Sequence, residues 1–501
     1  MALPAARPPV APPSLRSALG VGLLAIAGAV AAVVAGHAAI AAAWLVAWVV
    51  GAHLLLIPAV LIAVDAAGDR VRSGAGRTVG RGMRWLVTGL GAEARRIVRV
   101  VDEQRRLAVA CAVGALGSMV LTGPAMWRMA QGRANGYLAN DWLPFDRAVH
   151  ETGFWPLKLT TPHFVFPTVG AIVRVATATT PATATALTGI ASVGITGAVL
   201  VWFFHRPWAG GEPLSLSVAV IATLAFEVSD LPQYLFFGRS ALTFDRLNVS
   251  LHQWNTPSSV AVEWMQLVLL ISVARLGSGA APGRRWTAWV AVLTLVTTLT
   301  LPAVPAALSV GAPIWLWRSG RLDRFWLFVR AVIAPMVLAL ALAVAESILW
   351  LKPGWDPPLI VELGGSMAKL DLWGPGLMLL VPVALVALMG WRSFCEPDEV
   401  RLTGWSLAWA MLLLLTLALG GPRASEGNIG RVAFGASWIG YLFMVRWTLE
   451  LARGWRSWST WPVRRQVATP LVLAYVAITM VGGALMLLEQ SGAIVFTGAS
   501  I

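Results

Sequence analysis

The chain has 501 residues, of which 57% are hydrophobic and only 12% are charged, and its formal net charge is +14. Soluble domains carry about 25% charged residues, so this composition excludes a cytosolic enzyme, a disordered regulator and a disulfide-stapled secreted domain. It predicts an all-α, polytopic membrane protein. The abundance of Ala, Gly and Val, with arginine as the main cation, indicates a bacterial source.

Residues 1–106 form the first predicted unit. Residues 17–64 contain no charged side chain. Because about 20 residues cross the hydrocarbon of a bilayer, we expect two spans there, 18–36 and 41–64. The next segment, 65–106, is rich in arginine, with apolar residues at helical spacing between the charges. This pattern predicts an amphipathic helix on the anionic inner leaflet. No nucleic-acid recognition motif accompanies it, so we expect no nucleic-acid partner.

Residues 107–501 form the second predicted unit, a transmembrane core that brings the expected total to about 13 spans. The two runs around Pro302 are short, so two spans or one re-entrant hairpin both stay open. The predicted spans of this unit are 107–126, 181–204, 213–230, 257–275, 286–301, 302–317, 326–350, 374–391, 403–420, 432–452 and 467–487.

The distribution of Arg and Lys sets the expected orientation. Most of them fall in alternate loops, which the positive-inside rule places in the cytoplasm together with the N-terminus. The localisation expected is therefore the bacterial inner membrane, with outer loops at 127–180, 231–256 and 351–373. Arg330 and Arg446 fall within spans, and we expect both to snorkel toward the interface.

The first outer loop is long and rich in aromatic and acidic residues. Asp141–Glu151 and His163–Val175 are both amphipathic at helical spacing, which predicts two interfacial helices. Asp141 also suits a helix N-cap. Asp146 stands four residues before His150, a spacing typical of a solvated pair on a helix face.

This loop resembles the first outer loop of the GT-C glycosyltransferases, polytopic enzymes that use polyprenyl-phosphate-linked sugars. The resemblance rests on an acid in "NDW..F" followed by "TPHFVFPTVGAIVRV". It implies a GT-C-like core, a polyprenyl-phosphate sugar donor, and Asp141 as the loop acid. Glycosyl transfer needs a base that takes the proton of the acceptor hydroxyl. Asp141 is the first candidate for that base, and Asp146 is the second.

Further candidates for substrate binding lie on the same predicted side. Glu227, Asp230 and Glu263 lie at or near the outer ends of spans and are expected to line an acceptor cavity. His163 is a candidate for the donor phosphate. No two histidines have tight ligand spacing, so we assign no metal ligand, and a divalent cation stays an open alternative. The second outer loop adds polar and aromatic candidates for sugar or phosphate binding, which are Asp245, Arg246, His252, Trp254 and Asn255.

Together these features predict a glycosyltransferase acting at the extracytoplasmic face, with a lipid-linked or cell-envelope glycan as acceptor. A transporter or flippase of lipid-linked sugars is the first alternative, and it requires ionisable groups deep in the membrane. A surface-polysaccharide polymerase is the second alternative, and it calls for chemistry in a large late outer loop. Interfacial anchoring remains the structural alternative for Trp254.

Overall fold

A computed structural model describes the backbone of residues 84–131, 133, 165–207, 212–229, 257–277, 281–349, 384, 399–419 and 428–493. Every regular element within these ranges is a helix, and no strand occurs among them. The all-helical fold expected from the composition is therefore confirmed for this part of the chain. The predicted spans 18–36 and 41–64, most of 374–391, and the predicted helix 141–151 lie outside the described residues.

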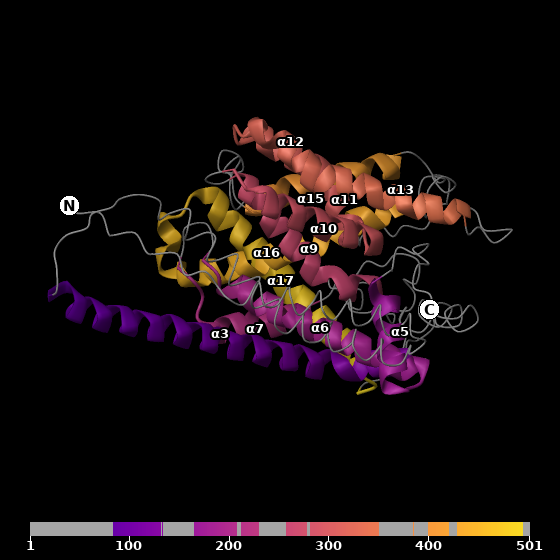
Figure 1. Ribbon diagram of the computed structural model, residues 1–501, viewed down its shortest axis with the longest axis horizontal. Coiled ribbons are helices and arrows are strands. Elements are labelled where there is room, and N and C mark those ends of the chain that lie inside the picture. The colour runs from indigo at the N-terminus through magenta and orange to yellow at the C-terminus, as the bar shows by residue number, and fades with distance from the viewer. Residues whose placement is uncertain are drawn as a thin grey trace.

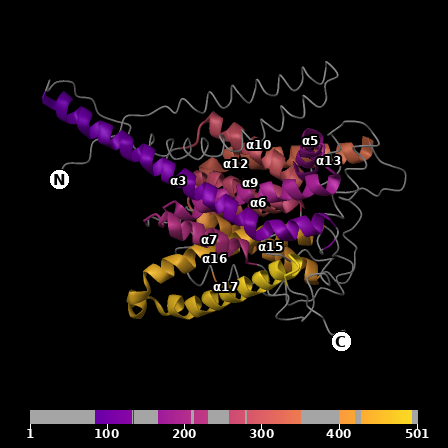
Figure 2. The same ribbon diagram turned by 90° about the horizontal axis from the view of Figure 1, so that it is seen from below.

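The first half of the bundle is built on one very long helix. The predicted span 107–126 and part of the basic segment before it are a single helix, because the Ala-, Glu- and Arg-rich junction favours helix throughout. Its N-terminal half extends beyond the other labelled helices (Figures 1 and 2). The elements of this half are α3 (Arg84–Ala130), α5 (Val165–Thr177), α6 (Pro181–His205), α7 (Leu216–Glu227) and α9 (Pro257–Ala274) with η2 (Arg275–Gly277).

The second half adds helices on both sides of α9. The short runs flanking Pro302 are two separate helices, α10 and α11, joined at Leu301 and Pro302. Figure 2 shows α16 and α17 together on one side of the bundle. The elements are α10 (Arg284–Thr300), α11 (Ala303–Arg318), η3 (Leu322–Arg324), α12 (Phe325–Phe328), η4 (Val329–Ile333), α13 (Ala334–Leu349), α15 (Glu399–Leu419), α16 (Asn428–Arg453), η6 (Trp455–Thr460) and α17 (Val463–Gln490).

Four of the described helices are long and apolar enough to cross a membrane. They are Glu103–Ala130, Pro181–His205, Leu322–Leu342 and Val463–Leu485. Each coincides with a span expected from the sequence, which supports a helical membrane protein. α7 is shorter than its predicted span 213–230, because Ser215 caps its N-terminus and it ends at Glu227. The full count of about 13 spans stays a prediction.

Glycines allow the central helices to approach closely. A Cβ at Gly114 of α3 would lie 3.2 Å from the carbonyl oxygen of Gly197 in α6, and a Cβ at Gly197 would collide with Ser118. Gly311 of α11 meets the backbone of Ser406 in α15 in the same way. Small residues at such crossings are typical of helix pairs in membranes, where close van der Waals contact drives association.

Candidate functional site

The ends of the helices that flank the first two predicted outer loops, 127–180 and 231–256, pack into one apolar cluster. We call it the loop-root cluster. Met129 lies near the end of α3 and Val165 begins α5, so these residues flank the first loop. Val228 follows α7 and Ala261 lies in the first turns of α9, so they flank the second. Its buried members are Ala125, Met126, Met129, Phe166, Val193, Ala261, Val262 and Leu487, with Val165 and Val228 packed against them.

The loop-root cluster therefore fixes the points where both loops leave and rejoin the helices. α5 matches the second interfacial helix expected at 163–175, shifted by two residues. Phe166 anchors it, being fully buried in the cluster. Two segments that are far apart in the sequence thus begin and end at the same end of the bundle.

Most of the predicted site residues lie in those loops, outside the described residues. His163 stands two positions before Val165, and Asp230 directly follows Ser229. Glu227 and Glu263 are the predicted site residues that the structure describes. The others outside the described ranges are Asp141, Asp146, Asp245, Arg246, His252, Trp254 and Asn255.

Two carboxyl groups lie buried near the loop roots. Glu227, the last residue of α7, is 0% exposed, and Glu263, in the second turn of α9, is 1% exposed. Removing a carboxylate from water is costly unless it is compensated. Buried ionisable groups in membrane helices therefore usually serve a function. The structure keeps both acids inside the bundle, close to the cluster residues Val228 and Val262.

Hydroxyl groups beside Glu227 form a directed chain across three helices. Thr479 of α17 donates a hydrogen bond to the Tyr441 hydroxyl over 2.8 Å, and Tyr441 of α16 donates to Ser229 Oγ over 2.8 Å. Ser229 in turn donates to the carbonyl oxygen of Ala225 over 2.7 Å. This chain ties the residue that precedes the second loop to the C-terminal helices. We call these three hydroxyl-bearing residues the hydroxyl chain.

A second polar bridge fixes α9 between α10 and α16. Gln266 donates from Nε2 to the carbonyl oxygen of Leu301 over 3.2 Å, and its Oε1 accepts from Trp438 Nε1 at 3.3 Å. Phe226 lies between this bridge and the hydroxyl chain, with its ring centroid 6.3 Å from that of Trp438 and 5.7 Å from that of Tyr441. Sequence reasoning missed these residues, although polar groups inside apolar runs were a usable signal.

The opposite end of the bundle carries paired charges. Arg206, which follows α6, lies 3.2 Å from Glu399 at the start of α15. Arg446 of α16 lies 2.9 Å from Glu450 and donates from Nη2 to the carbonyl oxygen of Arg206 over 3.3 Å. We call residues 205–207, 212–214, 399 and 446–453 the basic end.

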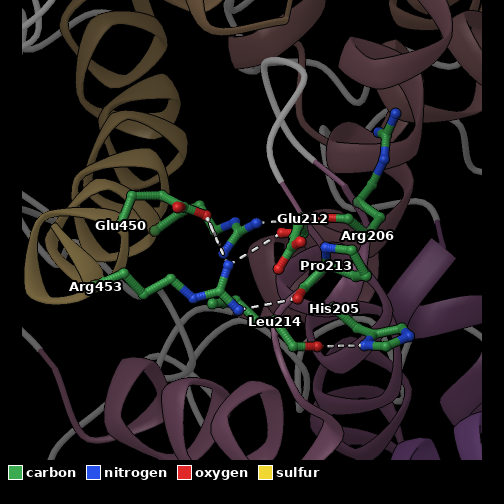
Figure 3. A network of polar contacts seen from close by, with 8 residues as sticks. His205, Arg206, Glu212, Pro213, Leu214, Glu450 and Arg453 are labelled. Atoms are coloured by element: carbon green, nitrogen blue, oxygen red, sulfur yellow. Dashed lines mark hydrogen bonds and ion pairs between the residues drawn. The ribbon is translucent and has the colours of Figure 1, made fainter.

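Backbone carbonyls complete the basic end, as Figure 3 shows. Arg453 donates to the carbonyl oxygens of Glu212 at 3.1 Å and of Pro213 at 2.9 Å, and His205 Nδ1 donates to that of Leu214 at 2.6 Å. These contacts hold the segment that precedes α7 against the end of α16. Since α6 ends here and α7 begins here, this end lies opposite the loop-root cluster.

The expected snorkelling of Arg446 is wrong. Its side chain is 1% exposed and is held between Glu450 and the α6 terminus, because contacts with a carboxylate and a carbonyl keep the guanidinium inside the bundle. Arg330, in contrast, is exposed. Within the described ranges, no group of three or more His, Cys, Asp or Glu side chains is placed to hold a metal ion.

Comparisons with known proteins assign no family at this point. No protein-family model matches the sequence, and no curated protein and no solved structure matches it significantly.

Proposed function

We propose that the protein is a bacterial inner-membrane glycosyltransferase. It transfers a sugar from a polyprenyl-phosphate donor to a lipid-linked or cell-envelope glycan on the extracytoplasmic face. The observation that carries this proposal is the loop-root cluster, because it gathers the roots of both loops that bear the candidate residues. The resemblance of the first of those loops to GT-C enzymes supports the reaction class.

In this proposal Asp141 is the general base. The acceptor oxygen attacks the anomeric carbon, the bond between that carbon and the phosphate oxygen breaks, and Asp141 takes the acceptor proton. The leaving polyprenyl phosphate gains negative charge, which needs cationic or hydrogen-bonding partners. His163 and His252 are assigned that role. Asp245, Arg246, Trp254 and Asn255 bind the sugar, and Glu227 and Asp230 bind the acceptor.

The proposal is tested by the mass of polyprenyl-phosphate sugars and acceptor glycans in membranes with and without the protein. Wild type is expected to consume the donor and to extend the acceptor by one sugar. Asp141→Ala is expected to lower that transfer by about 10²–10⁴-fold, since a general base contributes that much. Asp146→Ala, tested in parallel, decides which acid is the base.

Asp323→Asn is the matched control for these substitutions. Its carboxylate is 70% exposed and lies beyond the end of α11, away from the loop-root cluster. The control is expected to keep wild-type transfer. Full activity of both Asp141→Ala and Asp146→Ala would rule out the proposed base. Donor and acceptor masses that are the same in membranes with and without the wild-type protein would rule out the transferase.

A flippase or transporter of lipid-linked sugars is the second candidate. The full burial of Glu227, Glu263 and Arg446 favours it, because transport pathways place ionisable groups inside the bundle. Vesicles loaded with a labelled lipid-linked sugar separate the two functions. A flippase moves the label between leaflets without changing its mass, whereas a transferase changes its mass.

A further inference from the structure

We propose that the turn between α16 and α17, residues 454–466, is a binding site for the phosphate headgroup of an anionic phospholipid. This inference does not depend on the proposed glycosyl transfer. It concerns the end of the bundle opposite the loop-root cluster, and it rests on the shape, the charge and the apolar flank of the turn.

The turn is held in one shape by specific contacts. It contains η6, and Gln466 of α17 donates from Nε2 to the carbonyl oxygens of Trp458 at 3.0 Å and Trp461 at 2.9 Å. The rings of these two tryptophans lie 5.4 Å apart. A Cβ at Gly454 would approach the Trp461 ring to 3.1 Å, so the ring packs closely against the backbone there.

The charge of the turn is positive. Between Glu450 and Glu489 the sequence contains no acidic residue, whereas Arg456, Arg464 and Arg465 all fall in the turn. The guanidinium of Arg465 lies 4.2 Å from the centre of the Trp461 ring and 5.8 Å from that of Trp447. This stacking fixes one cation. Arg456 and Arg464 are exposed and available to an anion.

An apolar stripe continues from these cations along α17. Val463, Val467 and Leu471 are 74%, 61% and 67% exposed, and they stand at successive steps of four residues. Arg464 shares a helix face with Val467 and Leu471, because residues three and seven positions apart lie on one face. A lipid whose phosphate meets Arg464 would therefore lay its acyl chain on this stripe, which belongs to a candidate membrane-spanning helix.

The combination fits a phospholipid better than a soluble anion. Tryptophans gather at the level of lipid headgroups, and arginines near the surface attract anionic lipids by an amount that corresponds to about fivefold in affinity for each cation. The positive-inside rule places this turn at the cytoplasmic leaflet, where anionic lipids supply the matching charge. The occupant is therefore an anionic phospholipid with its acyl chains.

The test uses the full-length protein in detergent and native mass spectrometry. Phosphatidylglycerol or phosphatidylcholine is titrated, and the bound lipids are counted. Wild type is expected to retain phosphatidylglycerol selectively. The double variant Arg456→Gln/Arg464→Gln is expected to weaken that binding by about tenfold or more, and each single variant by about fivefold. Arg464→Lys keeps the charge and is expected to bind nearly as wild type does.

The matched control is Arg284→Gln/Arg285→Gln. This pair of exposed arginines also opens a helix, α10, and its removal lowers the net charge equally. This control is expected to change the affinity for phosphatidylglycerol by less than about twofold. That change is smaller than the one expected for the loss of a single arginine from the proposed site. Equal losses in both double variants, or equal binding of the two lipids, would overturn the site. Displacement by inorganic phosphate alone would overturn the assignment to a lipid. Thermal unfolding of each variant shows that the fold is kept.

Discussion

The two ends of the bundle satisfy buried polar groups in different ways. At the basic end, carboxylates lie directly against arginines, as in Glu399 with Arg206 and Glu450 with Arg446. Near the loop-root cluster, a chain of hydrogen bonds joins neutral donors and acceptors, from Thr479 through Tyr441 to Ser229. Ion pairs are thus among the contacts that stabilise one end, and a chain of hydroxyl groups is among those that stabilise the other.

This difference indicates that the two ends contribute differently to the stability of the bundle. A buried ion pair is strongly destabilised when one partner is lost, since the other charge stays in a medium of low dielectric. A hydroxyl that loses one partner can often turn to a nearby carbonyl, so its loss is milder. We therefore expect local unfolding to cost more free energy at the basic end than at the loop-root end.

Breaking the basic end should have the largest effect on stability. Arg446→Met removes the partner of Glu450 and the hydrogen bond to the Arg206 carbonyl. We expect the free energy of unfolding to fall by about 3 kcal/mol, the lower part of the range for buried pairs, because Glu450 is 23% exposed. Reversible unfolding in mixed micelles measures the change.

Arg453→Gln is the matched control for Arg446→Met. Arg453 is 40% exposed and donates to two backbone carbonyls, so its loss should lower the free energy of unfolding by less than about 1 kcal/mol. Equal effects of the two substitutions would contradict the central role given to Arg446.

Weakening the loop-root end should have a smaller and more local effect. Tyr441→Phe keeps the ring on Phe226 but removes the hydroxyl that joins Thr479 to Ser229. We expect a loss of about 1 kcal/mol and faster amide exchange around residues 225–229, measured by hydrogen–deuterium exchange. Exchange at 446–453 should stay unchanged.

Thr448→Val is the control for Tyr441→Phe. It removes a hydroxyl from the same helix, α16, where that hydroxyl donates to the carbonyl oxygen of Met444. Exchange at 225–229 should not respond to it. If both variants speed exchange there, the hydroxyl chain does not specifically hold the root of the second loop.

The smallest effect is expected for the partly exposed ion pair. Glu399→Gln weakens the contact with Arg206, whose side chain is 26% exposed. At low salt the loss of unfolding free energy should be about 0.5 kcal/mol, in the range measured for pairs in contact with water. It should shrink further at high salt. A loss of unfolding free energy as large as that of Arg446→Met would show that the pair of Glu399 with Arg206 contributes as much to stability as the pair of Glu450 with Arg446.

The sequence located several helices closely because local signals bound them. The predicted span 181–204 is α6, which Thr180 caps and Pro181 opens. The predicted span 257–275 is α9, which begins at a proline. The break expected between the basic segment and the span 107–126 does not occur in α3, since a change from polar to apolar composition does not interrupt helix geometry.

The candidate site was less accessible to sequence reasoning. Apolar patterning and charge placed Glu227 near a membrane surface, but they could not show that the bundle buries it. Snorkelling was the expectation for Arg446 because its i,i+4 partner Glu450, which lies in the same predicted span 432–452, was not recognised as its ion-pair partner. The pairing of Gln266 with Trp438 joins residues 172 positions apart, and no local pattern reports it.

The sequence by itself therefore determined an apolar, helical chain of membrane type and the places where many of its helices begin and end. Both follow from composition and from neighbouring residues. Only the tertiary structure decided that the roots of two distant loops share one cluster, and that Tyr441 joins Ser229 across 212 positions. Such contacts depend on how the helices pack, which glycines and buried polar pairs set at close range.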